Sequence, residues 1–300
     1  MVKESTIPSR GVLLFAENNH RMNYLKLAVI AAKCVKNNMG SDVKVAVVTT
    51  NGSIGWFKDE KDLDVFDEII ISDPQQDVAK NLRVYRDTRY HAIQDLFLNK
   101  NRASAYDLSP FDETILMDVD YFVLNDSLNK VWGSQEELMI NAKAHSLLHQ
   151  PLSGPEFRLN PYGIRMYWAT LIYFKKGTKG KLLFDLVFHI KECWDYYKHV
   201  YDFPGGLFRN DFAFSIAIHM LNGFTDAPNF ARPFPSDSIL TAIDTDQFIK
   251  FDDKTTASFF ANDPHATHKF YLSKIKGVNV HCLNKISVLN KADEILEVLS

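Results

Sequence analysis

The chain has 300 residues, which is enough for one large α/β domain or two small ones. Its 34 basic residues nearly balance its 37 acidic ones, so the formal net charge of −3 argues against general nucleic-acid binding. The three cysteines are far apart and form no CxxC pair, so neither a disulfide framework nor a zinc site is indicated.

The first half of the chain alternates between strand and helix patterns. Short apolar or β-branched runs predict buried strands, and longer apolar-rich segments predict helices. In chain order we expect a strand at 12–16, a helix at 22–37, strands at 43–49 and 66–71, a helix at 78–98, and strands at 114–118 and 121–124. This alternation predicts an α/β fold with a mixed, mostly parallel sheet flanked by helices. In such a sheet the ligand lies beyond the carboxyl ends of the strands.

The second half of the chain is less regular. A long loop is expected at 145–165, because prolines, glycines and histidines gather there. After it we expect a strand at 169–174, helices at 181–201 and 210–222, a late strand at 278–282 and a helix at 290–299. No segment approaches the ~20 consecutive apolar residues of a membrane span, and the polar start does not resemble a secretory signal. We therefore expect a cytoplasmic protein with no membrane span.

The strongest chemical signal is the segment TILMDVDYFVLND, in which Asp118 and Asp120 follow an apolar strand. Alternate residues of an extended segment point the same way, so the two carboxylates are expected to converge. Two like charges so close are costly unless a cation or protons neutralise them. Mg²⁺ and Mn²⁺ favour oxygen ligands and commonly share them with phosphate oxygens. The alternative is that Asp-x-Asp at a strand end only caps a turn.

This segment resembles the DxD motif of GT-A-type glycosyltransferases. Residues 15–38 and 278–285 also resemble segments of the glycogenin-like and bacterial galactosyltransferase group, in the same order along the chain. The resemblance implies a GT-A-type, Rossmann-like single domain over residues 1–300. Residues 1–125 would form the nucleotide-sugar-binding half. Residues 126–300 would form the acceptor-binding half and include the C-terminal strand that contacts metal and phosphate.

The resemblance also implies a donor site. In this group the loop after the first strand holds the base and ribose of the nucleotide. The matching positions in this loop are Ala16, Glu17, Asn18 and Asn19. Val119, the residue between the two aspartates, is a further candidate for contact with the donor. Short polar side chains at a strand end are able to read the edge of a base, although ordinary loop polarity explains the same pattern.

The late segment VNVHCLNK resembles the strand in which a histidine is the third metal ligand and a nearby lysine reaches the pyrophosphate. His281 and Lys285 match these roles, with a shorter spacing than in the group and without its intervening glycine. An imidazole ligand suits Mn²⁺ better than Mg²⁺. A histidine in a strand is otherwise a structural residue.

The segment GLFRNDFAFSIAIHM opens a helix with Asp211 and its neighbour Asn210. The resemblance implies that this acidic residue lies near the reacting sugar and acts in catalysis. The family's Asp-Gln-Asp is here replaced by an arginine, Asn210 and Asp211. The structural alternative is that either residue caps the helix.

Three arginines at three-residue spacing, Arg83, Arg86 and Arg89, share one face of the helix expected at 78–98. Arg86 is the first choice for a contact with the diphosphate or donor sugar, and Arg89 the second; a solvated basic face is the alternative. His265 and His268 offer another metal pair with no obvious third ligand. Aromatic residues near the expected loop, Tyr162 and Trp168, are candidates for acceptor binding.

Taken together, these residues predict a Mn²⁺- or Mg²⁺-dependent glycosyltransferase that uses a UDP- or GDP-linked sugar and an acceptor hydroxyl. One alternative is a nucleotidyltransferase with the same metal–phosphate chemistry, although the first loop lacks the glycine-rich sequence expected there. A second alternative is a nucleotide-sugar-binding protein without activity. The sequence does not specify the acceptor or the oligomeric state.

Overall fold

A computed structural model describes most of the chain. The described residues are 8–57, 60–72, 82–86, 92–96, 101–152, 163–202, 208–226, 229–236, 238–263, 266 and 269–300. Within them, no helix is both long and apolar enough to cross a membrane.

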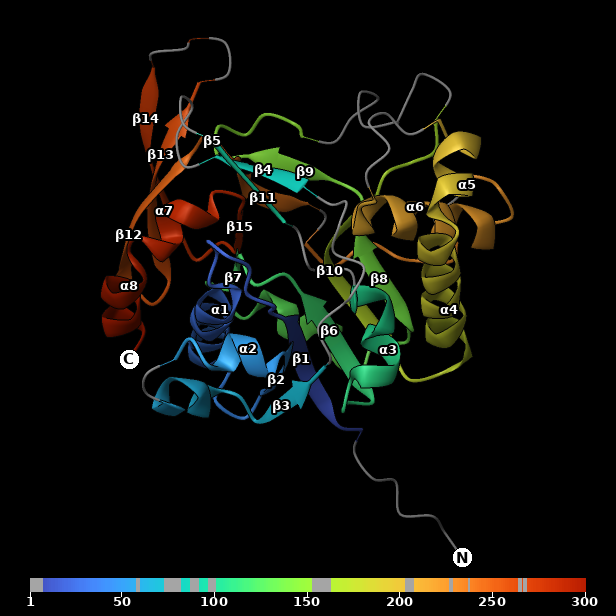
Figure 1. The fold of residues 1–300 in the computed structure, drawn as a ribbon, viewed down its shortest axis with the longest axis horizontal. Helices are drawn as coiled ribbons and strands as arrows, with labels where there is room; N and C mark the ends of the chain where they lie inside the picture. The colour runs from blue at the N-terminus through green and yellow to red at the C-terminus, as the bar shows by residue number, and fades with distance from the viewer. Residues whose placement is uncertain are drawn as a thin grey trace, which may run out of the picture.

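The centre of the fold is a six-stranded sheet in the order β3-β2-β1-β6-β10-β8 (Figure 1). Its strands are β1 (Arg10–Phe15), β2 (Lys44–Thr49), β3 (Glu68–Ile71), β6 (Glu113–Met117), β8 (Leu138–Asn141) and β10 (Trp168–Lys175). The first four in this order are parallel, and β10 runs antiparallel to both of its neighbours. This confirms the expected mixed, mostly parallel sheet.

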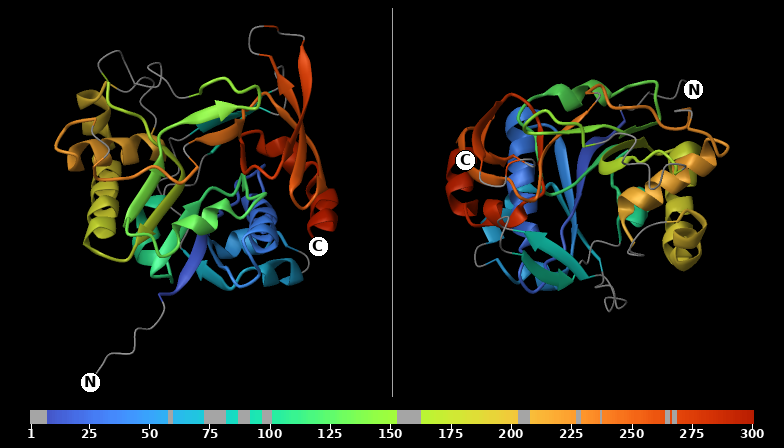
Figure 2. Two further views of the ribbon diagram at one scale, coloured as in Figure 1. Left: turned by 180° about the vertical axis from the view of Figure 1, so that it is seen from behind. Right: turned by 90° about the horizontal axis from the view of Figure 1, so that it is seen from above.

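Helices cover both faces of this sheet (Figure 2). One face packs against α1 (Tyr24–Asn38), and the other packs against α4 (Thr178–Glu192) and α6 (Asn210–Leu221). The sequence of β1 explains why, because it is apolar at consecutive positions. Val12 and Leu14 join the core on the α1 side, and Leu13 joins the core beneath α4 and α6. A strand buried on both faces is typical of a central position in a parallel sheet.

A second, four-stranded sheet brings distant parts of the chain together. Its order is β7-β15-β11-β9, with β7 (Tyr121–Phe122), β9 (Ala144–Ser146), β11 (Ile239–Ala242) and β15 (Val280–Cys282). Strand β15 runs antiparallel to β7, and His281 lies opposite Tyr121. The late strand is therefore placed next to the segment that contains Asp118 and Asp120.

Strands β12 (Gln247–Asp253), β13 (Thr256–Asn262) and β14 (Phe270–Lys276) form an antiparallel sheet that the sequence patterns do not reveal. After β15 the chain ends with α7 (Lys285–Leu289) and α8 (Ala292–Leu299), and α8 contacts both α1 and β12. The remaining short elements are α2 (Asn51–Ile54), α3 (Ala105–Leu108), α5 (Trp194–Val200), η1 (Glu60–Val65), η2 (Asn101–Ser104) and η3 (Ser127–Val131).

The prediction of a helix at 78–98 is wrong. The structure has an antiparallel strand pair there, β4 (Leu82–Arg86) and β5 (Ala92–Leu96). Apolar residues alternate with polar ones at the start of β4, which is a strand period, whereas the three-residue arginine spacing favours a helix. The helix expected at 181–201 is divided into α4 and α5 at Cys193.

Candidate functional site

Asp118 and Asp120 lie where β6 ends. All five residues of β6 are buried, and the chain leaves the sheet directly after Met117. The backbone N–H of Asp118 donates to the carbonyl of Thr170 on β10 (3.0 Å), and the N–H of Tyr121 donates to the carbonyl of Asp118 (3.1 Å). This tight turn places both carboxylates at the carboxyl end of the strand. The side chain of Asp120 is 3% exposed and that of Asp118 is 26% exposed, so one carboxylate is enclosed and the other is accessible to a ligand.

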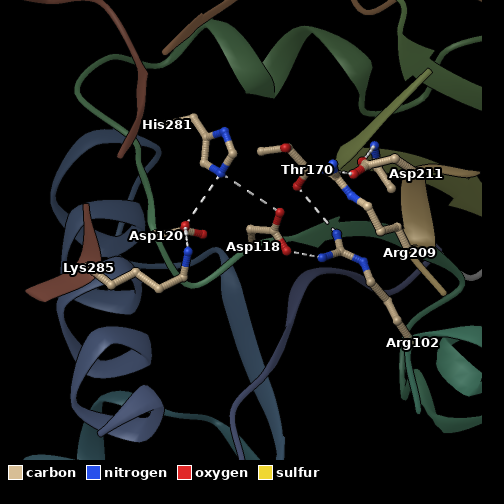
Figure 3. Close-up of polar contacts among 9 residues, drawn as sticks. Arg102, Asp118, Asp120, Thr170, Arg209, Asp211, His281 and Lys285 are labelled. Carbon is tan, nitrogen blue, oxygen red and sulfur yellow. Dashed lines mark hydrogen bonds and ion pairs between the residues drawn. The ribbon is translucent and has the colours of Figure 1, made fainter. Parts of the chain in front are cut away.

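His281 completes the cluster from β15. Its Nε2 lies 3.4 Å from Oδ2 of Asp120 and 4.0 Å from Oδ2 of Asp118 (Figure 3). One ligand atom from each of the three residues lies within 4.8 Å of the others. These distances show that Nε2 is the ring nitrogen that faces the carboxylates, and the buried Nδ1 has no hydrogen-bond partner among the described residues. The structure thus brings the three predicted metal ligands together.

Two cations flank these carboxylates. Arg102, on η2, forms an ion pair with Oδ1 of Asp118 and donates to the carbonyl of Thr170 (3.3 Å). Lys285, the first residue of α7, forms an ion pair with Oδ2 of Asp120. Figure 3 shows the arginine and the lysine reaching the acidic pair from opposite sides. With a neutral imidazole, the two acidic and two basic side chains balance in charge.

The two carboxyl groups differ in their electrostatics. Burial raises the pKa of Asp118, and the neighbouring Asp120 raises it further, against the opposing effect of Arg102. Burial also acts to raise the pKa of Asp120, but the charge of Lys285 and the contacts of His281 outweigh it, so this pKa is well below its usual range. Asp120 is therefore the carboxylate that its surroundings hold more firmly in the ionised state.

The donor set fits a divalent metal ion. Two carboxylate oxygens and one imidazole nitrogen converge, and Asp118 and Asp120 retain oxygen lone pairs beyond those used by the flanking cations. A mixed oxygen and nitrogen set of this kind suits Mn²⁺, and carboxylates also bind Mg²⁺. His281 lies on β15 and the two aspartates lie in the turn between β6 and β7, so the pairing of β15 with β7 brings the imidazole to the carboxylates.

Arg102 is the site residue that sequence analysis misses. It is the largest of the fully buried side chains and is 2% exposed, although it lies in the polar stretch NKNRAS. An isolated arginine in such a stretch is usually solvent-exposed, so its residue type gives no signal of burial. Only the packing of η2 against α4 and the sheet reveals that this arginine points to Asp118.

The loop after β1 contains the four residues expected to hold the base and ribose, Ala16, Glu17, Asn18 and Asn19. Oδ1 of Asn18 accepts from the backbone N–H of Leu25 (2.9 Å), and Oδ1 of Asn19 accepts from the N–H of Met22 (2.8 Å). These bonds fix the shape of the loop, so both asparagines have a structural role. Glu17 is half-buried, and burial raises its pKa. Val119, between the two aspartates, is 5% exposed.

Asp211 and Asn210 open α6, as expected for that segment. Oδ1 of Asp211 accepts a hydrogen bond from the backbone N–H of Ala169 (2.9 Å), and Oδ2 pairs with Nη2 of Arg209 (2.9 Å). Ala169 precedes Thr170, the residue whose carbonyl accepts from Arg102. The acidic residue of α6 is thereby connected through β10 to the arginine beside Asp118 (Figure 3).

The other predicted site residues have varied outcomes. Arg83 and Arg86 lie on β4 and not on a helix, so the shared helical face does not exist, and their side chains lie outside the described part of the chain. Trp168 begins β10 and is 8% exposed, which leaves little of its ring for an acceptor. Arg89, Tyr162, His265 and His268 lie outside the described residues.

No protein-family model and no curated protein sequence matches the chain. Among solved structures, the glycosyltransferase GlyE of Streptococcus pneumoniae TIGR4 is similar at 12% identity and a TM-score of 0.39, over 77% of this chain and 45% of that one. The present chain thus spans less than half of GlyE.

The galactosyltransferase LgtC, solved with donor and acceptor sugar analogs, is similar at 13% identity and a TM-score of 0.40, over 77% of this chain and 73% of that one. An inositol-1-phosphate CTP transferase from T. maritima is similar at 9% identity and a TM-score of 0.34, over 70% of this chain and 96% of that one. Two of these three proteins are glycosyltransferases, the class that the DxD segment resembles. At TM-scores this low the likeness does not itself carry a function, which has to come from the geometry of the site.

Proposed function

We propose that this chain transfers a sugar from a nucleoside-diphosphate sugar, UDP- or GDP-linked, to an acceptor hydroxyl with the help of Mn²⁺ or Mg²⁺. The observation that supports this most strongly is the convergence of Asp118, Asp120 and His281 at the end of a buried parallel strand. These three residues would hold the ion. Bound there, it would neutralise negative charge on the leaving diphosphate.

The charge of the site favours a diphosphate as the ligand. Asp118 and Asp120 are already balanced by Arg102 and Lys285, with which they form ion pairs. A bound divalent cation would therefore leave the site positive, and an anionic ligand would restore the balance. Lys285 lies close enough to the acidic pair to contact a phosphate that binds beside it. Arg102 would act more by fixing Asp118, because its guanidinium is almost fully buried.

The remaining residues would position the two substrates. The loop at Glu17–Asn19 follows the central strand β1, at the same edge of the sheet as Asp118, and would hold the base and ribose. Asp211 would accept a proton from the acceptor hydroxyl in an inverting reaction. In a retaining reaction it would orient a sugar hydroxyl by hydrogen bonding.

The test is a thermal-shift measurement with UDP or GDP, in the presence and absence of Mn²⁺. We expect the nucleotide to raise the melting temperature only with metal, because the metal supplies its main contact. Asp120→Asn should abolish the response. Asp126→Asn is the matched control, since it makes the same change of charge a few residues further along the chain, at an exposed position with no side-chain capping bond.

A nucleotide response that is equal without Mn²⁺, or that persists in Asp120→Asn, would contradict the proposed site. Product analysis then separates the reaction classes. Release of nucleoside diphosphate from a nucleotide-sugar supports glycosyl transfer, and formation of a nucleotide-sugar from a triphosphate and a sugar phosphate supports a nucleotidyltransferase. Metal-dependent binding with neither product supports a protein that binds nucleotide-sugars without activity.

A further inference from the structure

The distal half of the β13–β14 hairpin exposes several large apolar side chains. Phe270 is 47% exposed, Tyr271 45%, Leu272 70% and Phe260 43%. Phe260 pairs with Leu272 across the two strands, so these side chains lie side by side on one face. Figures 1 and 2 show this end of the hairpin standing away from the body of the protein. We call these four residues the hairpin tip.

Both faces of the hairpin tip are apolar. Side chains alternate between the two faces of a strand, so Phe270 and Leu272 point one way and Tyr271 points the other. On the Tyr271 side, Ile275 and the cross-strand neighbour Ala261 pack against the core, and Tyr271 itself is exposed. Phe270 and Leu272 are exposed on the other side. A flat protein surface would cover one face of such a tip and leave the other in water. A lipid surface would surround both faces.

Exposed lysines flank the hairpin tip. Lys269 directly precedes Phe270 and Lys274 lies two residues after Leu272, whereas Lys276 lies at the far end of β14. Strand β14 itself contains no acidic residue, and Asp263 donates its backbone N–H to the carbonyl of Lys269 in the connecting turn. Asp252, the acidic side chain that Lys274 contacts, is shared with Lys250, so its charge is already compensated. Apolar and aromatic side chains flanked by lysines are the combination that binds the interface of an anionic bilayer.

We propose that the β13–β14 hairpin docks this protein on an anionic lipid surface, with the hairpin tip entering the headgroup region and the lysines contacting lipid phosphates. Strand β14 ends at Lys276, and β15, the strand of His281, begins at Val280. Docking through the hairpin would therefore hold the candidate metal site at a defined distance from the membrane. The inference does not depend on the proposed sugar transfer, because its test uses binding alone.

The experiment is co-sedimentation of the full chain with vesicles of phosphatidylcholine alone or mixed with phosphatidylglycerol. We expect binding to the anionic vesicles that weakens with salt. The double variant Phe270→Ser with Leu272→Ser should reduce the partition coefficient at least about tenfold, because two apolar side chains no longer enter the interface. The control pair is Leu182→Ser with Phe188→Ser on α4, each 48% exposed in the native chain, and it should bind as the wild type does.

A second variant tests the charge contribution without touching the apolar residues. Lys269→Gln with Lys274→Gln should lower binding to anionic vesicles by about fivefold for each lysine and leave binding to neutral vesicles unchanged. Three results would overturn the proposal. They are no binding to either vesicle, an equal loss in the α4 control pair, and a dimer in solution that the Phe270→Ser, Leu272→Ser variant dissociates. The last would show that the hairpin tip is covered by a second copy of the chain.

Discussion

The guanidinium of Arg102 bonds at once to the carboxylate of Asp118 and to the backbone carbonyl of Thr170 on the neighbouring strand. One buried side chain thus connects η2, the end of β6 and β10. A buried ion pair of this kind contributes little net stability compared with an apolar replacement of both partners, but removing one partner leaves an uncompensated charge. Arg102 therefore determines where the Asp118 carboxylate lies.

This contact predicts the effect of replacing Arg102. Arg102→Met should lower the free energy of unfolding by about 3 kcal/mol, the lower end of the range for breaking a buried pair, because Asp118 remains partly accessible to water. Arg102→Lys should cost about 1–2 kcal/mol, since an ammonium group does not reproduce the two-pronged contact. Urea denaturation without metal measures both. Arg232→Met, which removes an exposed ion pair with Glu136, should change stability by less than about 0.5 kcal/mol. An equal loss of unfolding free energy in all three variants would contradict the conclusion that Arg102 forms a buried ion pair that the fold depends on.

His281 predicts the metal preference of the site. The wild type should bind Mn²⁺ more tightly than Mg²⁺, because imidazole suits the softer ion. His281→Gln should weaken Mn²⁺ binding at least about tenfold and affect Mg²⁺ less, since it offers an oxygen in place of the nitrogen. Isothermal titration calorimetry with each metal measures the change. His145→Gln, which replaces a histidine bonded to Ser238, is the control and should leave both affinities as they are. Unchanged Mn²⁺ affinity in His281→Gln would remove this residue from the site.

Asp211 is the predicted catalytic residue whose role depends on the proposed function. Asp211→Asn keeps an oxygen for the backbone N–H of Ala169 but removes the charge, so the protein should remain folded. If Asp211 is the base, the rate of nucleotide release from the donor sugar should fall by about a hundredfold or more. Arg209→Met removes the partner of Asp211 and leaves its carboxylate in place. An equal loss of rate in both variants would mean that the ion pair orients the site, and that Asp211 is not a base.

Asp67, which is not part of the candidate site, makes the stability of the fold depend on pH. Burial acts to raise its pKa, but hydrogen bonds from Lys36, Lys44 and the backbone N–H of Val45 outweigh this and lower the pKa from 3.8 to about 2. A depressed carboxyl pKa stabilises the fold above the unfolded value, and this stability is lost as the pH falls through the folded value.

At neutral pH, Asp67→Asn should therefore lower the free energy of unfolding by about 1 kcal/mol, allowing for solvent screening of a partly exposed group. The difference from the wild type should shrink as the pH falls from 3.8 towards about 2. Urea denaturation as a function of pH measures it. Asp185→Asn removes an exposed ion pair with Lys181 on α4 and serves as the control. If the difference in unfolding free energy between Asp67→Asn and the wild type stays constant over this pH range, the lowered pKa of Asp67 is not its cause.

The parts of the fold that the sequence predicts are those buried on both sides. Strands β1, β2 and β6 are continuous apolar runs because helices cover both faces of the sheet, and such runs are readable without the structure. Asp118 and Asp120 are conspicuous for the same reason, since they interrupt such a run at its end. The place where His281 joins them depends on the pairing of β15 with β7, and in the sequence analysis it follows only from the family resemblance.

The parts that the sequence does not predict have physical causes as well. The β12–β13–β14 sheet mixes exposed apolar and buried polar residues, among them Leu272 and Ser258, so the usual alternation is lost. The pair β4 and β5 is misread because three arginines at three-residue spacing imitate a helical face. Arg102 cannot be identified from the sequence, because the burial of a single charged side chain depends on its partner, and that partner lies in another part of the chain.

The assembly of the second sheet has a consequence for how the protein is made. The aspartates of the candidate site are synthesised in the first half of the chain, but His281 and Lys285 arrive near its end, on β15 and α7. Contacts between such distant segments also cost more loop-closure entropy than local contacts. A nascent or truncated chain that lacks β15 and α7 would therefore leave Asp120 without Lys285 and His281, while Asp118 would keep Arg102, and the candidate cation site would be incomplete. Competence to bind metal would thus arise only after β15 and α7 have been synthesised, and shorter chains would lack it.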